Sequence, residues 1–412
     1  MGAQSPGNRE QRVVSHMSQR YLIKSVEAVA LAATWDKVFG SWDRVPRSLL
    51  NPAANQIVMP RRGQFATLVR VRTEDGLEGI GEAYGLPQPE ITATLIGGLM
   101  GHMLIGQDAF ASEMIWDRLF AAQKGAGHTG GFWLEAISGI DQALWDLRGK
   151  ALGQPVHRLL GGPVRDRIYC YASPVMMLAT PAESAAKALE YVATGHRAIK
   201  LKLGRGYAID LAHAQAVRDA VGPSIELLTD LNCAYGVAEA VKVAGALAEL
   251  GFTWFEEPLD VDDLEGLAEV RSRIELPVVA GECWFGRYQF KQALLRRAVD
   301  TVMPNPARAG GITECLKIAH LCSAFWVDVS WHGVGSGINI AAALQLAAVV
   351  PNFRIYERNQ LLNPLREGIL ATPIEFLDGH LRVPSGAGLG VDVDEAGVRQ
   401  YEVLRAVASE PL

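Results

Sequence analysis

The 412-residue sequence has few cysteines, no long apolar run and no excess of basic residues. Its five cysteines form no C-x-x-C pair, and their odd number argues against a disulfide framework or a zinc site. No apolar run reaches the length of a membrane-spanning helix. The net charge of −6 disfavours nucleic acid as the main partner, because DNA-binding proteins usually carry a basic surface. These absences predict a reduced, cytoplasmic protein with no membrane or nucleic-acid partner.

The composition is that of a folded protein with a large core. Hydrophobic residues make up 49% of the chain and charged residues 20%, which excludes a disordered protein. The length fits two domains, or one large barrel with an attachment. Residues 1–18 carry charges and no apolar signal segment, so we expect a disordered tail there.

Residues 19–163 are predicted to form an α+β unit. Residues 23–33 resemble a strand, and two alternating segments around Asp75 and Gly76 predict a hairpin. Residues 134–151 have apolar side chains at helical spacing, and Gly153 is a plausible end for that helix. Residues 35–63 show little periodicity, which predicts a long loop able to act as a lid or binding loop.

Residues 164–358 alternate short apolar runs with amphipathic helical patterns, which is typical of a parallel sheet. Eight runs at spacings of roughly 25 residues fit a (β/α) TIM-type barrel. These runs are residues 168–172, 198–203, 226–231, 253–257, 278–281, 301–304, 326–330 and 353–357. Residues 359–412 contain hairpin-like segments, and we expect them to return to the N-terminal unit.

Polar side chains stand at the ends of nearly all these runs, where a barrel of this kind places its catalytic groups. Asp230, Glu256 and Glu282 lie at the ends of three consecutive predicted strands. Three converging carboxylates repel one another unless a cation joins them, and hard oxygen ligands suit Mg²⁺. The alternative is a set of capping or surface acids, which the matching spacing of all three disfavours.

Lys200 and Lys202 flank one residue on the strand before these acids, so both side chains point to the same face. Two neighbouring ammonium groups disfavour each other's charge, which predicts that one of the lysines loses its proton easily and acts as a base. An exposed strand edge or a phosphate-binding pair is the alternative for this short motif.

Two histidines lie in glycine-rich segments. His332 follows the seventh predicted strand and is a candidate acid or base, although a structural histidine is equally consistent with the position alone. His128 lies between Gly125 and Gly131 and is a weaker candidate for reaching the site from the N-terminal unit.

Several of these motifs together resemble the enolase superfamily, in its mandelate racemase and muconate lactonizing enzyme branch. The resemblance extends over nearly the whole chain from residue 23. The matching segments are residues 136–146, 149–150, 152–153, 155, 159–162, 200–202, 230–232, 256–258, 281–282 and 310–312.

The resemblance implies a modified (β/α)7β barrel with a capping domain made from the N-terminal region and the C-terminal segment. It also implies Mg²⁺ as the cofactor, a small-molecule carboxylate as the substrate and a homo-oligomer. In the roles that the resemblance implies, Asp230, Glu256 and Glu282 are the metal ligands. Lys202 is the base that takes the α-proton, and Lys200 contacts the substrate carboxylate. His332 is the acid or base on the opposite face, and protonated Glu357 donates a hydrogen bond to the intermediate. Candidate substrate contacts are Asn232, Arg61, Trp35 and His128.

Asn305 departs from the family pattern, which has an aspartate after the sixth strand as the partner of the histidine. An amide oxygen could still orient the His332 ring, but it has no charge to stabilise the imidazolium. We therefore favour β-elimination of water from a sugar acid, giving a 2-keto-3-deoxy acid, over racemisation or epimerisation.

Two further functions stay open. A cycloisomerase acting on a hydrophobic substrate would suit the aromatic residues of the loop, Trp35, Phe39 and Trp42. A catalytically silent binding barrel is the non-enzymatic alternative. The basic residues of the same loop suit a polar or diacid substrate, although they could equally form a solvated loop; they are Arg44, Arg47, Arg61 and Arg62.

Overall fold

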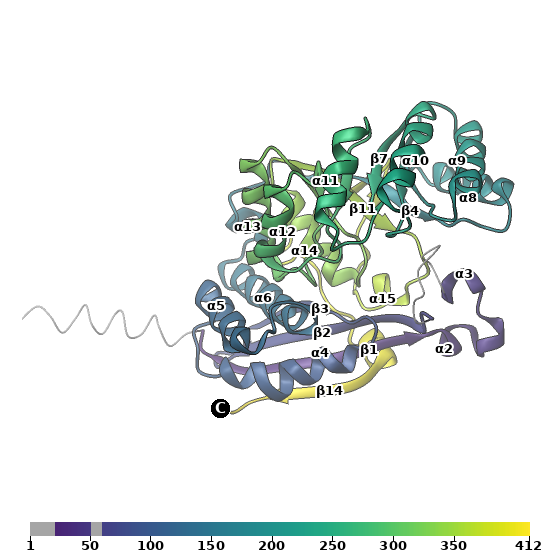
Figure 1. Cartoon of the computed structure of the whole chain (residues 1–412). Coiled ribbons are helices and arrows are strands. Elements are labelled where there is room, and N and C mark those ends of the chain that lie inside the picture. The colour runs from purple at the N-terminus through teal and green to yellow at the C-terminus, as the bar shows by residue number, and fades with distance from the viewer. Residues whose placement is uncertain (1–20, 51–59) are drawn as a thin grey trace, which may run out of the picture.

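The computed structural model describes residues 21–50 and 60–412. It has a barrel and a capping domain that packs against it, as Figure 1 shows with the barrel above and the cap below. The predicted tail, residues 1–18, lies outside the described residues. Within residues 21–50 and 60–412, no helix combines the length and the apolar character needed to cross a membrane.

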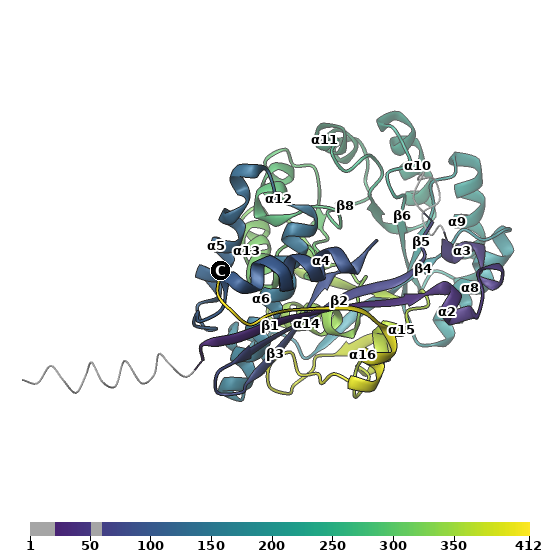
Figure 2. The same ribbon diagram turned by 90° about the horizontal axis from the view of Figure 1, so that it is seen from below.

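The cap is built on a four-stranded antiparallel sheet with the order β14-β1-β2-β3. The strands are β1 (Ile23–Thr34), β2 (Gly63–Thr73), β3 (Glu78–Tyr84) and β14 (Glu402–Ala408). Figure 2 shows the yellow C-terminal strand β14 lying along the purple β1. The predicted strand, the hairpin and the return of the C-terminal segment to the cap are therefore confirmed.

Helices cover the cap sheet and connect it to the barrel. They are α4 (Pro89–Leu95), the π-helical turn η2 (Ile96–Met100), α5 (Ser112–Ala122), α6 (Gly131–Leu152) and α7 (Val156–Leu159). Helix α6 packs on β2 and β3, and most of its residues are buried. It ends where the sequence predicts, because Gly153 adopts the left-handed conformation with φ of 63°.

Eight parallel strands form the barrel, and β11 pairs with β4 to close it. All eight correspond to the predicted runs. They are β4 (Arg167–Val175), β5 (Ala198–Lys202), β6 (Glu226–Asp230), β7 (Phe252–Glu256), β8 (Val278–Ala280), β9 (Thr301–Val302), β10 (Asp328–Trp331) and β11 (Phe353–Asn359).

Seven helices connect these eight strands, so the predicted (β/α)7β barrel is confirmed. They are α8 (Pro181–Ala193), α9 (Tyr207–Val221), α10 (Val237–Glu249), α11 (Leu264–Arg273), α12 (Gly286–Leu295), α13 (Gly311–Ala324) and α14 (Gly337–Ala347). Amphipathic spacing explains the arrangement of the predicted helical segments, in which an apolar stripe faces the strands. Helix α14 differs, because all of its residues are buried.

The segment after the barrel does not return to the cap at once. It forms α15 (Pro364–Glu367), the short hairpin of β12 (Phe376–Leu377) and β13 (His380–Arg382), and α16 (Glu395–Tyr401). β13 pairs antiparallel with β4, so the hairpin extends the barrel sheet. Only the last strand, β14, joins the cap sheet.

The prediction of an irregular loop over residues 35–63 is wrong for its first part. Residues 35–50 contain α2 (Trp35–Phe39), the 3-10 turn η1 (Trp42–Arg44) and α3 (Arg47–Leu50). Each element is too short to produce a helical period in the sequence. Residues 51–59 of the predicted loop lie outside the described residues.

Candidate active site

The carboxyl ends of the barrel strands bring together the charged residues that the sequence singles out. Asp230, Glu256 and Glu282 place ligand oxygens within 4.8 Å of one another. Asp230 and Glu256 are the last residues of β6 and β7, and Glu282 follows β8. Neighbouring parallel strands end at the same rim, which is why residues far apart in sequence converge here.

Lys200 is fully buried among these acids. Its Nζ lies 2.7 Å from Glu256 Oε1, 3.3 Å from Glu357 Oε1 and 3.6 Å from Asp230 Oδ2. The Nζ also lies 5.3 Å above the centre of the Tyr171 ring. Burial lowers the pKa of Lys200, but the charges of Glu256 and Glu357 outweigh burial and raise the pKa well above its usual value.

Lys202 points to the same face and forms an ion pair with Asp230. Burial and the neighbouring Lys200 lower its pKa, but Asp230 outweighs them and the pKa is raised. The carboxylates around the pair thus oppose the effect of the two ammonium groups on each other. The role of Lys202 as the base stays a prediction.

The charges of the site do not balance without a divalent cation. Asp230, Glu256, Glu282 and Glu357 are four acids around two lysines, so the fully ionised set has an excess of two negative charges. Burial and the charges of Asp230 and Glu357 raise the pKa of Glu256 well above its usual value, even though Lys200 lowers it. A largely buried all-oxygen set with this charge fits Mg²⁺.

The neighbours of Glu357 favour its ionised form. Burial alone would raise its pKa, but Lys200, His332 and the Gly333 amide, which donates to Oε2 at 2.8 Å, hold the pKa below its usual range. The fully buried ammonium group of Lys200 beside Glu357 thus disfavours the protonated form, and the role of Glu357 as a hydrogen-bond donor stays a prediction.

His332 is buried beside two of the acids. Its Nε2 lies 3.3 Å from Glu282 Oε2 and 3.6 Å from Glu357 Oε2. On the other side of the ring, Nδ1 lies 3.0 Å from Asn305 Nδ2. The amide nitrogen of Asn305 therefore faces the ring, and the amide oxygen, which we expected there, does not.

Backbone groups hold the Asn305 amide in this orientation. Its Nδ2 donates to the Val334 carbonyl at 2.7 Å, and its Oδ1 accepts from the Ala307 N–H at 2.9 Å. A flipped amide would place oxygen against oxygen and N–H against N–H. Nδ1 of His332 is thus a hydrogen-bond acceptor, and the neutral ring carries its hydrogen on Nε2, facing the acids.

The predicted substrate contacts have different environments. Asn232 is buried with φ of 43°, and its N–H donates to Asp230 Oδ1. Arg61 donates a hydrogen bond to Gln64 Oε1 at 3.0 Å. Burial lowers the pKa of Arg61, because the opposing charges of Tyr84 and Glu282 do not offset it.

The structure does not bring the other two predicted contacts into the buried cluster. Trp35 is fully buried at the start of α2, and its ring meets Phe39 edge to face. His128 is exposed, and its ring stacks with Trp133. The remaining arginines of the loop, Arg44, Arg47 and Arg62, are exposed.

Sequence reasoning missed three residues around the cluster. β4 runs three residues beyond the predicted strand, and its inward alternation places Tyr171 and Ser173 inside the barrel. Arg308 donates to the Glu282 carbonyl at 3.2 Å and pairs with Glu135 of the cap at 3.3 Å. Arg308 lies in a loop, so no strand pattern identifies it.

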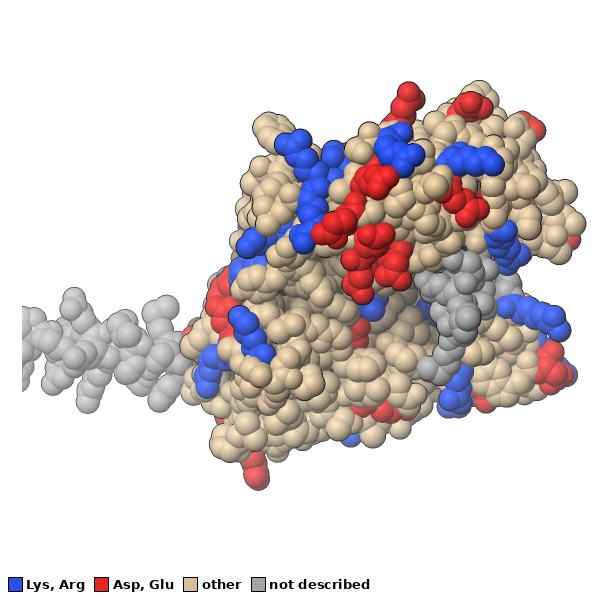
Figure 3. Space-filling model, viewed as in Figure 1, with Lys and Arg blue, Asp and Glu red and all other residues tan. Residues whose placement is uncertain are grey.

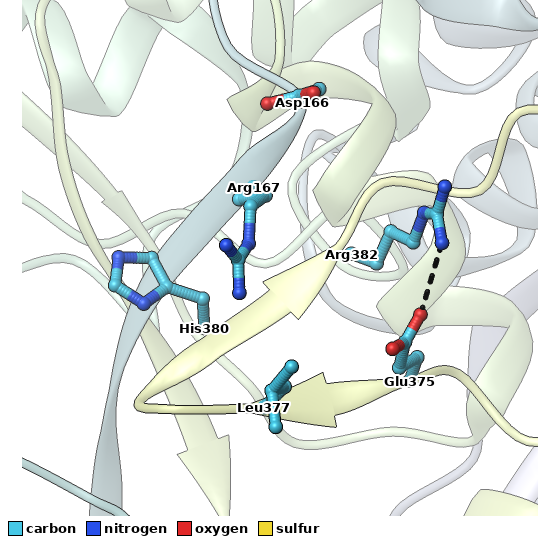
Figure 4. Close-up of a pocket in the computed structure, with 6 residues that line it drawn as sticks. All are labelled: Asp166, Arg167, Glu375, Leu377, His380 and Arg382. Atoms are coloured by element: carbon cyan, nitrogen blue, oxygen red, sulfur yellow. Dashed lines mark hydrogen bonds and ion pairs between the residues drawn. The ribbon is translucent and has the colours of Figure 1, made fainter.

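A separate pocket of about 270 Å³ lies at the other end of β4. Figure 4 shows it between the first residues of β4 and the β12–β13 hairpin, with Arg382 paired to Glu375. Its lining acids, Asp166 and Glu375, are exposed. Because barrel chemistry occurs at the carboxyl ends of the strands, we assign the active site to the buried cluster.

Charged side chains are interspersed on the face in Figure 3, and acidic ones gather between the barrel above and the cap below.

Two family models match the chain. The chain matches the family model described as enolase C-terminal domain-like over residues 183–397. It matches the mandelate racemase / muconate lactonizing enzyme N-terminal domain over residues 49–161.

Three relatives are similar over most of their length. D-galactarolactone cycloisomerase from Agrobacterium fabrum is 37% identical over 82% of this chain and 91% of its own. Arabinonate dehydratase from Saccharolobus solfataricus is 31% identical, over 81% of this chain and 89% of its own. The crystal structure of 3,6-anhydro-D-galactonate cycloisomerase from Zobellia galactanivorans superposes with a TM-score of 0.81 at 31% identity, covering 93% of this chain and all of that one. The chain belongs to the mandelate racemase / muconate lactonizing enzyme branch of the enolase superfamily.

Proposed function

We propose that the protein removes the α-proton of a sugar acid and then expels the oxygen at the β-carbon, with Mg²⁺ as cofactor. The leading form of this reaction is a dehydration that gives a 2-keto-3-deoxy acid. Support comes from the buried cluster and from relatives that include arabinonate, D-galactonate and D-gluconate dehydratases. A silent barrel would have no reason to bring four acids and two lysines together, most of them buried.

Lys202 is the proposed base, and its Nζ is the better placed of the two lysines to meet a substrate. Its side chain is 15% exposed, whereas that of Lys200 is fully buried. Mg²⁺ bound to Asp230, Glu256 and Glu282 would supply positive charge for the enediolate oxygens and would weaken the hold of Asp230 on the Lys202 proton. Lys200 adds a fixed positive charge on the same side.

His332 is the proposed hydrogen-bond donor to the leaving oxygen, and this assignment carries the choice of reaction. In the dehydration the oxygen leaves with its bonding electrons and takes a proton from solvent, which gives water. The strand of His332, β10, is separated from that of Lys202, β5, by β11 and β4 on one side and by β6 to β9 on the other. The two side chains therefore face each other across the barrel mouth. Because Nε2 already carries the ring hydrogen, His332 can donate a hydrogen bond there but cannot accept a proton, as a two-base racemase requires.

A cycloisomerase is the second candidate, because two of the relatives carry that activity in their names. In a cyclic sugar acid whose β-oxygen belongs to the ring, the same elimination opens the ring. No water is lost, so the product is an isomer of the substrate. The same roles for Lys202 and His332 serve both reactions.

Proton NMR in D₂O, with Mg²⁺ and a panel of sugar acids and their lactones, tests the proposal. We expect one substrate to disappear into a keto acid, and its mass then separates dehydration from ring opening. Chelation with EDTA should stop the reaction, and Mg²⁺ should restore it. A substrate that only exchanges its α-proton while its stereoisomer appears would overturn the proposal in favour of a racemase.

The variant Lys202→Ala, assayed on the same substrate, tests the base. We expect α-proton exchange to fall by roughly a hundredfold or more, while Mg²⁺ binding measured by calorimetry persists. Normal exchange in this variant would exclude Lys202 as the base. Loss of Mg²⁺ binding as well would assign Lys202 to the metal site.

A further inference from the structure

Glu82 of the cap domain binds the first turn of a barrel helix. It lies on β3, is 1% exposed and reaches the amino end of α14. Its oxygens accept the Ser336 N–H at 2.9 and 3.1 Å and the Asn339 N–H at 2.9 Å, and Ser336 Oγ also donates to Oε2. A carboxylate satisfies the free N–H groups of a helix start and the positive end of its dipole. Here that carboxylate comes from the other domain.

The backbone before α14 is shaped around this contact. Gly335 has φ of 152°, and a Cβ there would lie 2.7 Å from Asn339 Nδ2 and 2.9 Å from Glu82 Oε1. Any other residue at this position would push Glu82 and Asn339 apart. Glycine therefore allows the two side chains to meet against the same turn.

Asn339 connects this turn to the active site. Its Nδ2 donates to Asn305 Oδ1 and to the Val334 carbonyl, each at 3.1 Å. Its Oδ1 is buried with no hydrogen-bond partner among the described residues. A buried amide with one orphan oxygen costs stability relative to an apolar side chain of the same size, so packing alone does not account for it.

The contacts thus run from Glu82 to Asn339, from Asn339 to Asn305, and from Asn305 Nδ2 to His332 Nδ1. We propose that Glu82 and Asn339 are positioning residues for His332, which hold the Asn305 amide so that the ring keeps its hydrogen on Nε2. Docking of the cap and the orientation of the proposed donor are then parts of one hydrogen-bonded unit. The proposal relies on the proposed function for what His332 does, but its test observes the ring directly.

The test uses the full-length protein labelled with ¹⁵N-histidine and loaded with Mg²⁺. The chain has nine histidines, so subtraction of a His332→Gln spectrum assigns the two ring nitrogens. In the wild type we expect Nδ1 in the region of unprotonated ring nitrogen and Nε2 in the protonated region. The opposite pattern would overturn the proposal at once.

Asn339→Leu is the decisive variant, because it removes the amide and the orphan oxygen but keeps the backbone N–H that binds Glu82. We expect the two His332 shifts to move toward each other, kcat to fall roughly ten- to hundredfold with a smaller change in KM, and the melting temperature not to fall. Glu82→Gln should move the shifts in the same direction. If Glu82→Gln does not fold, Asn339→Leu decides alone.

Asp141→Asn is the matched control. Asp141 of the cap accepts the Thr313 N–H at 2.9 Å and so holds the start of α13 across the same domain interface. In the part of the chain that the structure describes, it makes no hydrogen bond to Asn305 or His332. The variant should leave the His332 shifts unchanged. If the His332 shifts are also unchanged in Asn339→Leu and Glu82→Gln, the positioning role of Glu82 and Asn339 is overturned. If the shifts change in these variants but the wild-type protein is inactive on all sugar acids, the positioning role is retained and the proposed function is refuted.

Discussion

At the scale of single residues, the site depends on hydrogen positions as much as on charge. Asparagine has an NH₂ group where aspartate has an oxygen, and this one difference changes which ring nitrogen of the facing histidine carries the hydrogen. The Asn305 amide nitrogen makes Nδ1 of His332 an acceptor, whereas a carboxylate would make it a donor. The ring atom that faces the substrate then changes from donor to acceptor.

Asn305→Asp should therefore give His332 the ability to act as a base. The carboxylate would face the Val334 carbonyl, which now lies 2.7 Å from Nδ2, so we expect a loss of stability of about 1–3 kcal/mol. Exchange of the substrate α-proton with D₂O from the His332 face should rise. The measurement is deuterium incorporation by NMR in the double variant with Lys202→Ala, which removes exchange by the lysine. No exchange in the double variant would mean that the Asn305 amide does not limit His332.

The sequence was sufficient to predict which residues converge, but not how they interact. Asp230, Glu256 and Glu282 lie at the ends of consecutive strands, and strand order alone brings them together. The lowered pKa of Glu357 and the orientation of Asn305 depend on partners from distant segments, such as Lys200 and Val334. No local pattern records those partners.

At the scale of elements, the barrel is predictable because each strand is a short apolar run between amphipathic helices. Even β9, which has two residues, stands where the pattern places it. The short helices α2 and α3 were not predictable, because five and four residues cannot show a helical period. The pairing of the β12–β13 hairpin with β4 is a contact between residues about 200 positions apart, which periodicity does not predict.

The end of α6 gives a stability prediction for one element. Gly153 has φ of 63°, and a Cβ there would meet nothing within 4 Å, so a substitution costs only backbone strain. Gly153→Ala should lower the unfolding free energy by about 1 kcal/mol, because the left-handed conformation disfavours a side chain. Gly153→Asn should lose less, since asparagine tolerates that conformation. Urea unfolding compares them, and equal losses in the two variants would point to a cause other than the backbone angle.

At the scale of the whole molecule, the interface between cap and barrel is lined with buried acids of the cap. Glu82 binds α14, Asp141 binds α13, and Glu135 pairs with Arg308. Burial raises the pKa of Glu82 to about 7, of Asp141 to about 7 and of Glu135 to about 8, although hydrogen bonds or Arg308 lower each of them. Stability of the two-domain molecule should therefore depend on pH through these groups.

The direction of this pH dependence follows from whether the folded or the unfolded chain binds the proton more tightly. Asp141 ionises near pH 4 when the chain is unfolded and near pH 7 when it is folded, so the folded protein holds an extra proton between these values. The unfolding free energy should then fall as the pH rises through this window, by up to about 1.4 kcal/mol per pH unit for this group, with the loss complete above pH 7.

Asp141→Asn removes this contribution, so the variant should gain stability relative to the wild type as the pH rises from 5 to 8. Urea unfolding of both proteins at pH 5, 6, 7 and 8 with Mg²⁺ present measures the difference, in which the effects of Glu82 and Glu135 cancel. The exposed Asp166, changed to Asn, controls for net charge. A difference between wild type and Asp141→Asn that is constant with pH would show that Asp141 keeps its charge at the interface, and that the Thr313 hydrogen bond outweighs its burial.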